Sequence, residues 1–258
     1  MRTPGVLAAL LAVIMVAACG LDKQDPLGRQ ERAWVKEHGS VKVGVHQNYP
    51  PFSFLEQDGK PAGISIDLWR FMAEKLGFKV EFFPAEMQQQ QDDLQVGRLD
   101  SLGGIFPLAS RKALMDFSAP YYAVSTSIFV NAQVRDVSKL ADLQSLKVGV
   151  VQGDSGQGIC AAAGIKPQLF SGYGDAVLAL GQGRLQAIVM DEPVVLYYRQ
   201  KLGLLDKVEW ATGRPVVNRN DLALPVKKGN AVLLRILNKG LAAAAGSEMQ
   251  RIGERWLK

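Results

Sequence analysis

The sequence contains little of the chemistry that metal sites, disulfide scaffolds and nucleic-acid-binding surfaces use. Its 258 residues include only two cysteines and two histidines, and these are not clustered at the spacing of metal ligands. The formal net charge is only +5, and no run of Lys or Arg marks a nucleic-acid-binding segment. The sequence also lacks a Ser-His-Asp arrangement and a phosphate-binding loop. We therefore expect no cofactor, no metal and no nucleic-acid partner.

One long apolar run is present, and it lies at the N-terminus. Residues 6–16 are almost all apolar, and they follow Arg2. A basic start, an apolar stretch and small residues predict a secretory signal peptide over residues 1–18. The ending Val-Ala-Ala-Cys at 16–19 resembles the lipobox of bacterial lipoproteins, which implies cleavage before Cys19 and acylation of its sulfur. The alternative is a plain signal peptide or anchor helix with an incidental cysteine.

The segment after Cys19 is predicted to be a tether rather than a domain. It is polar and contains Pro26, so we assign residues 19–40 to a lipid-anchored tether that ends in a short helix through Trp34. If Cys19 is acylated, Cys160 has no partner within the chain. We therefore expect Cys160 to be a small buried side chain rather than a reactive thiol.

The remaining chain contains the same order of elements twice. Residues 41–45 and 146–150 have nearly the same strand pattern, and Gly-Arg-Leu occurs both at 97–99 and at 183–185. Each Gly-Arg-Leu follows an amphipathic helix and precedes an apolar strand. Strands that alternate with helices indicate parallel sheets with crossover helices. The repeat therefore predicts two similar α/β units side by side.

Two segments are expected to connect these units. Residues 127–132 lead out of the first unit, and residues 221–226 form a strand-like return. Helices over 232–245 and 249–257 follow the return and should pack on the first unit. Two crossings between two units form a hinge with a cleft between them. The predicted organisation is lobe 1 over residues 41–130, lobe 2 over 131–220, and a return to lobe 1 over 221–258.

Several stretches resemble the family 3 extracellular solute-binding proteins. They are YPPFSF at 49–54, GISIDL at 63–68, Arg111-Lys112 with DFSAPYY at 116–122, VGVVQG at 148–153, and Gly183-Arg184-Leu185 leading to Asp191. The resemblance extends from about Val41 to Trp256. It implies an α/β protein with the two-lobed periplasmic-binding-protein type II fold, which closes on a ligand between its lobes. The commonest ligands of the family are amino acids, delivered to ABC importers.

An amino acid requires one site for its carboxylate and one for its ammonium group. A planar guanidinium donates two hydrogen bonds to a carboxylate, and the resemblance places such an arginine at Arg111. It also implies that Asp191 receives the ammonium group. Both residues follow predicted strands, at the edge where open α/β sheets bind ligands. The alternatives are a turn-capping role for Arg111 and a helix N-cap at Asp191.

Further candidates surround these two residues. The loop at 153–156 joins a strand to a helix, so its backbone N–H groups and the Ser155 hydroxyl, with Asp154 beside it, can meet the same ligand carboxylate. An ordinary glycine-rich turn is the alternative. The resemblance also implies that Tyr49 and Phe52 form an aromatic wall, although core packing explains Phe52 equally well.

Other positions depart from the family pattern. Residues 103–108 replace a stretch where relatives place hydroxyls near the ligand, so Gly104 and Phe106 would border it instead. Ile64 stands where an aromatic ring is common. His46 stands where many relatives carry an acid for a basic ligand, which disfavours a lysine- or arginine-type ligand, and a structural role is its alternative. An apolar or aromatic amino acid, or an unusual acid, is therefore compatible with the pattern.

The sequence favours a binding protein over an enzyme. We expect a monomer, held by its lipid in the periplasm, that captures its ligand by hinge closure. A sensor is an alternative, and because no further domain follows Lys258 it would act through a partner receptor. Cyclohexadienyl dehydratase resembles this fold, but only Glu192 and His46 offer acid/base groups here. A lipoprotein that has lost ligand binding is the last alternative.

Overall fold

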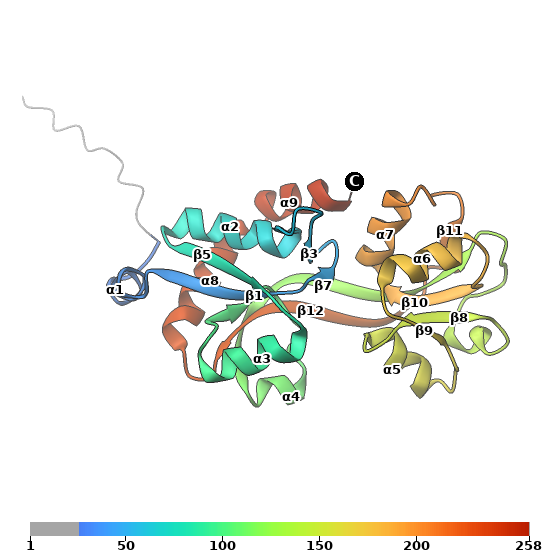
Figure 1. Ribbon diagram of the computed structural model, residues 1–258, viewed down its shortest axis with the longest axis horizontal. Helices are drawn as coiled ribbons and strands as arrows, with labels where there is room; N and C mark the ends of the chain where they lie inside the picture. Colours follow the sequence, from blue (N-terminus) through green and yellow to red (C-terminus); the bar gives the residue numbers. More distant parts are fainter. Residues whose placement is uncertain (1–25, 258) are drawn as a thin grey trace, which may run out of the picture.

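The computed structural model describes residues 26–257, which form two halves joined by two long strands (Figure 1). The joining strands are β7 (Met115–Asn131) and β12 (Val216–Lys227), which pair antiparallel along most of their length. The predicted signal peptide and Cys19 lie outside the described residues. Within residues 26–257, no helix has both the length and the apolar character that crossing a bilayer requires.

The first half is built on a sheet with the order β5-β1-β6-β12-β7. Strand β1 is parallel to both β5 and β6, whereas β12 runs antiparallel to β6. Helices α2, α8 and α9 cover one face of this sheet, and α3 and α4 cover the other (Figure 1). A small separate sheet contains β2 (Asn48–Tyr49), β3 (Ser53–Leu55) and β4 (Pro61–Ala62). The bounds of the other elements are β1 (Ser40–Val45), β5 (Lys79–Pro84), β6 (Ser101–Leu102), α2 (Ile64–Leu76), α3 (Met87–Val96), α4 (Ala109–Lys112), α8 (Ala231–Ala244) and α9 (Ser247–Leu257).

The second half repeats this arrangement. Strand β8 is parallel to both β9 and β10, and β10 pairs antiparallel with β7. Helices α6 and α7 lie on one side of this sheet and α5 on the other (Figure 1). The bounds are β8 (Val148–Val151), β9 (Gln168–Phe170), β10 (Ala187–Asp191), β11 (Val208–Trp210), α5 (Ser155–Ala162), α6 (Tyr173–Gly181), α7 (Glu192–Lys201) and the 3-10 helix η1 (Leu140–Leu143).

The helices follow local sequence patterns. In α2, Leu68, Met72 and Leu76 recur at helical spacing and are buried, as predicted from the sequence. Gly77 ends this helix with φ +73°, a left-handed conformation that glycine adopts without a steric cost. Helix α3 covers residues 87–96, the range that its pattern predicted. Cys160 is fully buried, as expected for a small core side chain.

Strand β7 is the element whose length was not predicted from the sequence. Its start was expected near Ser127, but β7 begins at Met115 and contains the whole 116–122 motif. Its backbone finds partners along β12, from Met115 opposite Lys227 to Ser127 opposite Val216, with three register shifts on the way. This long-range pairing, rather than any local pattern, extends the strand. The apolar strand predicted after the Gly-Arg-Leu at 97–99 is short and comprises only β6.

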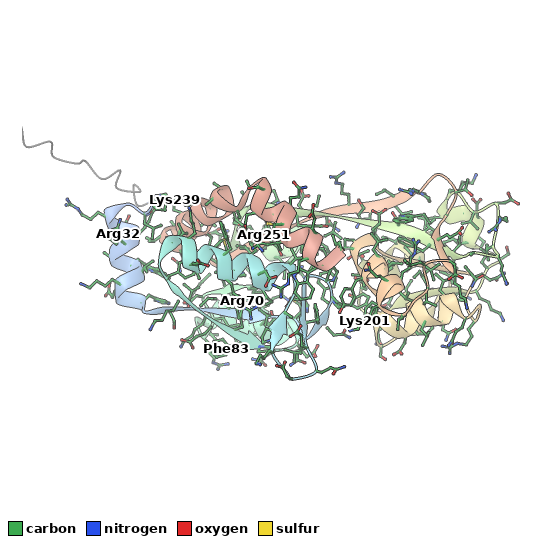
Figure 2. All side chains as sticks on the ribbon, turned by 90° about the horizontal axis from the view of Figure 1, so that it is seen from above. Arg32, Arg70, Phe83, Lys201, Lys239 and Arg251 are labelled. Atoms are coloured by element: carbon green, nitrogen blue, oxygen red, sulfur yellow. The ribbon has the colours of Figure 1, made fainter. Side chains whose placement is uncertain are left out.

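The last part of the predicted tether is folded onto the first half. It forms helix α1 (Arg29–His38), which packs against α8. Glu31 is only 4% exposed and accepts hydrogen bonds from Lys239 Nζ at 2.5 Å and from the Gly28 backbone N–H at 2.7 Å. The Lys239 contact is the main reason that the pKa of Glu31 is lowered. Figure 2 labels Lys239 beside α1.

Candidate functional site

Asp191 lies at the centre of a hydrogen-bonded cluster between the two halves. It ends β10 and its side chain is 0% exposed. Its Oδ1 accepts a hydrogen bond from Thr126 Oγ1 at 2.6 Å and a longer one from Ser155 Oγ at 3.4 Å, while its Oδ2 accepts one from Tyr49 Oη at 2.9 Å. Asp191 also occupies the N-cap position of α7, but its side chain makes no capping hydrogen bond. Its carboxylate is therefore directed at the interface rather than at the helix.

The sheet of the second half brings three of these residues together. The β7–β10 register places Thr126 opposite Asp191. Ser155 begins α5, just after β8, which runs parallel to β10, so the carboxyl ends of both strands reach the same edge. Gly156 allows this approach, because a Cβ there would lie 2.2 Å from the carbonyl oxygen of Val189 in β10.

Tyr49 comes from the first half and bridges to the second. Its ring stacks on Phe52 at 5.1 Å and lies 5.9 Å from the ring of Tyr173 in α6. Tyr49 is 8% exposed and Phe52 is 1% exposed. Phe52 also packs edge-on against Tyr122 at 5.0 Å. Tyr49 thus contacts the second half directly, whereas Phe52 belongs to the core beneath it.

Asp154 adds a second acidic side chain to the cluster. Burial, together with the nearby charge of Asp191, raises its pKa to about 7. Its Oδ2 atom is buried and has no hydrogen-bond partner within the described part of the chain. Burial also raises the pKa of Asp191, and both acids contribute to raising the pKa of Tyr173. Two carboxylates therefore share a poorly solvated space.

Arg111 lies apart from this cluster, in the short helix α4. Its Nη1 donates a hydrogen bond to the Phe106 carbonyl oxygen at 3.0 Å, which is the turn-capping geometry considered as its alternative role. Its described hydrogen bonds do not include Asp191 or Ser155. Burial, and secondarily the charge of Arg111, lower the pKa of His46 to about 4. His46 is therefore neutral near pH 7, beside a cationic guanidinium.

The remaining predicted residues are mainly packed against the first half. Gly104 has φ +140°, and a Cβ there would lie 2.1 Å from the Tyr121 hydroxyl oxygen, so glycine is required for this packing. Phe106 is partly buried against the main core cluster. Ile64 is 0% exposed at the start of α2 and belongs to the main core cluster.

Three residues of the site were missed from the sequence. Thr126 lies within a long strand, where no local motif distinguishes it, and Tyr173 begins α6 after a simple glycine turn. The third is Ser127, whose Oγ donates a hydrogen bond to Glu192 Oε1 at 2.6 Å. Glu192, one of the two candidate acid/base groups, therefore already has a hydrogen-bond partner. The pairing of β7 with β10 places Thr126 and Ser127, and the ring contact with Tyr49 places Tyr173.

Two further observations concern metal binding and a groove outside this cluster. Within residues 26–257, no group of His, Cys, Asp and Glu side chains is arranged to hold a metal ion. A groove of about 410 Å³ lies in the second half and includes none of the predicted site residues. Its lining residues are Arg199, Glu209, Trp210, Ala211, Thr212, Gly213 and Arg214.

The hydrogen bond from Tyr49 to Asp191 should stabilise the closed arrangement of the two halves, and removing the Tyr49 hydroxyl tests this. We expect Tyr49→Phe to keep the ring contacts but to weaken the closed arrangement by about 1–3 kcal/mol, because a buried carboxylate loses a donor. Small-angle X-ray scattering of the ligand-free protein should then show a larger radius of gyration. The control is Tyr197→Phe, whose hydroxyl, within residues 26–257, accepts a hydrogen bond from Lys201 of its own helix and has no other. Identical scattering from both variants would contradict this role.

Comparison with known proteins gives a consistent family assignment. The family model for "Bacterial extracellular solute-binding proteins, family 3" matches residues 41–258. The chain is 26% identical over 260 residues to the L-cystine-binding protein TcyJ of Escherichia coli (strain K12), covering 97% of this chain and 94% of that protein.

Solved structures agree with this assignment. A histidine kinase sensor domain with similarity to periplasmic binding proteins is 28% identical, with a TM-score of 0.73, over 84% of this chain and 96% of that one. The ancestral amino-acid-binding protein AncCDT-1, a precursor of cyclohexadienyl dehydratase, is 28% identical, with a TM-score of 0.72, over 89% of this chain and 99% of that one. The fold is that of the type II periplasmic binding proteins, and the chain belongs to family 3 of the bacterial extracellular solute-binding proteins.

Proposed function

We propose that the two halves act as lobes that close on a small polar ligand, an amino acid or a close relative. The observation that supports this most directly is the environment of Asp191. A fully buried carboxylate at the interface receives hydroxyl groups from both halves. Such a group is costly in a protein of purely structural function, but it suits the binding of an ammonium group. Similarity to amino-acid-binding proteins supports the same ligand class.

Hinge closure supplies the mechanism. The strands β7 and β12 are the two connections, and bending within them would separate the halves. Asp191 would bind the ligand ammonium, with the Ser155 hydroxyl beside it, and Arg111 would bind the carboxylate after exchanging its Phe106 contact for the ligand. Closure is favoured only by contacts that the second lobe adds to those of the open state.

We further propose delivery to an ABC importer by a monomer held in the periplasm through a lipid on Cys19. The amino-acid- and cystine-binding relatives support transport. Similarity to a sensor domain supports a second candidate, in which the closed protein signals to a partner receptor. A dehydratase activity has weaker support. Glu192 accepts a hydrogen bond from Ser127, and the pKa of His46 is lowered to about 4, so His46 is a weak base.

A thermal-shift panel tests the proposal. With the chain from Leu21 onward, one amino acid at about 100 times its dissociation constant should stabilise the fold by about 2.7 kcal/mol. The melting temperature should rise by roughly 5–10 °C for a protein of this size. We expect Arg111→Ala to weaken binding by about 2–5 kcal/mol, as does truncation of one side of a buried charge pair.

The matched control is Arg98→Ala, which removes an exposed arginine paired with Asp93 in the same half. That variant should bind as wild type does. A flat panel of amino acids and small organic acids with folded, ligand-free protein would reject the proposed function. Equal affinity of Arg111→Ala and wild type would reject the role of Arg111 alone.

A further inference from the structure

A groove in the second half, apart from the site between the halves, is lined by two arginines and a tryptophan. Arg199 comes from α7 and Trp210 from β11, while Arg214 ends the turn that follows β11 (Figure 1). The groove has a volume of about 410 Å³, which is enough for a small molecule. It also contains Glu209, whose carboxylate forms no ion pair with another described residue. Two guanidinium groups therefore outnumber one carboxylate, and the groove carries a net positive charge.

Both arginines contact the same aromatic ring. The guanidinium carbon of Arg199 lies 5.5 Å from the centroid of the Trp210 ring, and that of Arg214 lies 4.5 Å from it. A guanidinium packed on an aromatic ring is held in place, while the N–H groups along its edge can still donate to an acceptor. Neither arginine is paired with an acid within residues 26–257, so the two cations around this ring repel each other. A bound anion would relieve that repulsion.

Most hydrogen-bonding capacity of these two arginines is unused by the protein. Arg199 Nη2 donates to the Leu205 carbonyl oxygen at 3.0 Å, but its Nε is buried and has no hydrogen-bond partner among the described residues. A buried donor without a partner is costly, and an ion bound beside it is one way in which proteins satisfy such a group. Apart from its contact with Trp210, the Arg214 side chain has no polar partner in the part of the chain that the structure describes.

The backbone holds Arg214 at this groove in a strained conformation. Its φ is +51°, in the left-handed region that residues with a Cβ seldom adopt. It also precedes Pro215, and a following proline restricts a residue to extended conformations. The Arg214 N–H donates to the Ala211 carbonyl oxygen at 2.9 Å, which closes the turn that presents the side chain. Strain of this kind is concentrated at ligand-binding positions, where the placement of a side chain outweighs its cost.

We propose that Arg199 and Arg214 form a phosphate-binding site in this groove, separate from the ligand site between the halves. A phosphate group carries one or two negative charges and has oxygens that face several directions, so it can accept hydrogen bonds from two guanidiniums at once. A carboxylate, by contrast, is matched by the planar edge of a single guanidinium. The phosphate group can belong to a free anion or to a lipid headgroup at a membrane surface, because both present the same oxygens.

Two binding assays with the chain from Leu21 onward, which contains every described residue, test this inference. The first is calorimetric titration with inorganic phosphate at low ionic strength, with sodium chloride as the reference salt. The second is co-sedimentation with phosphatidylcholine vesicles that contain or lack phosphatidylglycerol. We expect a dissociation constant below about 1 mM in at least one assay, and binding at least about 10-fold weaker in Arg214→Gly. Glycine adopts φ +51° without a steric cost, so this variant should not lower the melting temperature.

The control is Arg184→Ala, which removes an exposed arginine of the same half that does not line the groove, and it should bind as wild type does. Arg214→Lys keeps the charge but not the planar donor edge, so it should recover only part of the affinity. Phosphate binding that Arg214→Gly loses and Arg184→Ala keeps would identify a free anion, and the same pattern with anionic vesicles alone would identify a lipid headgroup. Absence of binding in both assays, or equal binding by Arg214→Gly and Arg184→Ala, would overturn the inference.

Discussion

Asp191→Asn should reduce affinity for the amino acid identified in the panel roughly 30-fold to several thousand-fold, which corresponds to about 2–5 kcal/mol. The substitution keeps the shape of the side chain and one oxygen acceptor. It removes the negative charge that the ligand ammonium would meet in a site from which water is excluded. One of the two hydroxyl groups, of Thr126 or Tyr49, can still donate to the amide oxygen, and the other can accept from the amide NH2 group, so the local packing should persist.

The same substitution should not destabilise the ligand-free protein at neutral pH. The pKa of Asp191 is raised in the folded state by burial, so its stabilising contribution is present below the ordinary aspartate pKa and is lost as the pH rises towards the folded value. At pH values above its folded pKa, the ionised group therefore opposes folding. Asparagine carries no charge there, so urea unfolding should give an unchanged or higher free energy of unfolding. Lost binding without lost stability is the expected sign of a functional charge.

Glu192→Gln provides the matched control for Asp191→Asn. It neutralises the next carboxylate along the chain, which accepts a hydrogen bond from Ser127. Calorimetric titration should show nearly wild-type affinity for this variant. If Glu192→Gln lost as much affinity as Asp191→Asn, a general effect of negative charge would replace the specific role of Asp191.

Gly156→Ala should have the second-largest effect, on both stability and binding. The new Cβ would lie 2.2 Å from the Val189 carbonyl oxygen, and that backbone atom cannot rotate away as a flexible side chain does. Helix α5 must then shift from β10, which costs about 1–3 kcal/mol and lowers the melting temperature by roughly 2–12 °C. Because α5 carries Asp154 and Ser155 towards Asp191, affinity should fall together with stability.

Gly158→Ala is the control within the same helix. Among the described residues, no atom beyond the neighbouring residues and backbone of its own helix lies within 4 Å of a Cβ at that position, so alanine should stabilise the helix by about 0.5–1 kcal/mol. Differential scanning calorimetry and ligand titration of the two variants would separate contact with β10 from helix propensity. Equal melting temperatures for the two variants would contradict a close approach at Gly156.

Local elements were more predictable than long-range ones. Helices α2, α3 and α7 agree with their sequence patterns to within a few residues, because helical periodicity and end signals are encoded within a dozen residues. Strand β7 was expected to be much shorter, because the residues of β12 that pair with it lie 89 to 112 positions further along the chain. Helix α1 was expected to be part of a tether, because its burial depends on α8 near the C-terminus.

The residues of the candidate site also differ in how far they could be predicted from the sequence. Its acidic residue and its glycine-rich loop could be named from the sequence, since strand ends and helix starts are local features. Thr126 could not, because only the β7–β10 register places it opposite Asp191, 65 residues away.

The sequence by itself determined the two α/β units, their order along the chain and the family to which the chain belongs, because hydrophobic periodicity, turn residues and motif order are properties of neighbouring residues. The tertiary structure alone decided which side chains meet. Tyr49 reaches Asp191 across 142 residues, and the pKa of Asp154 is raised by burial and by the nearby charge of that carboxylate. Hydrogen bonds between distant strands and the loss of solvent around buried charges arise only when the halves pack together.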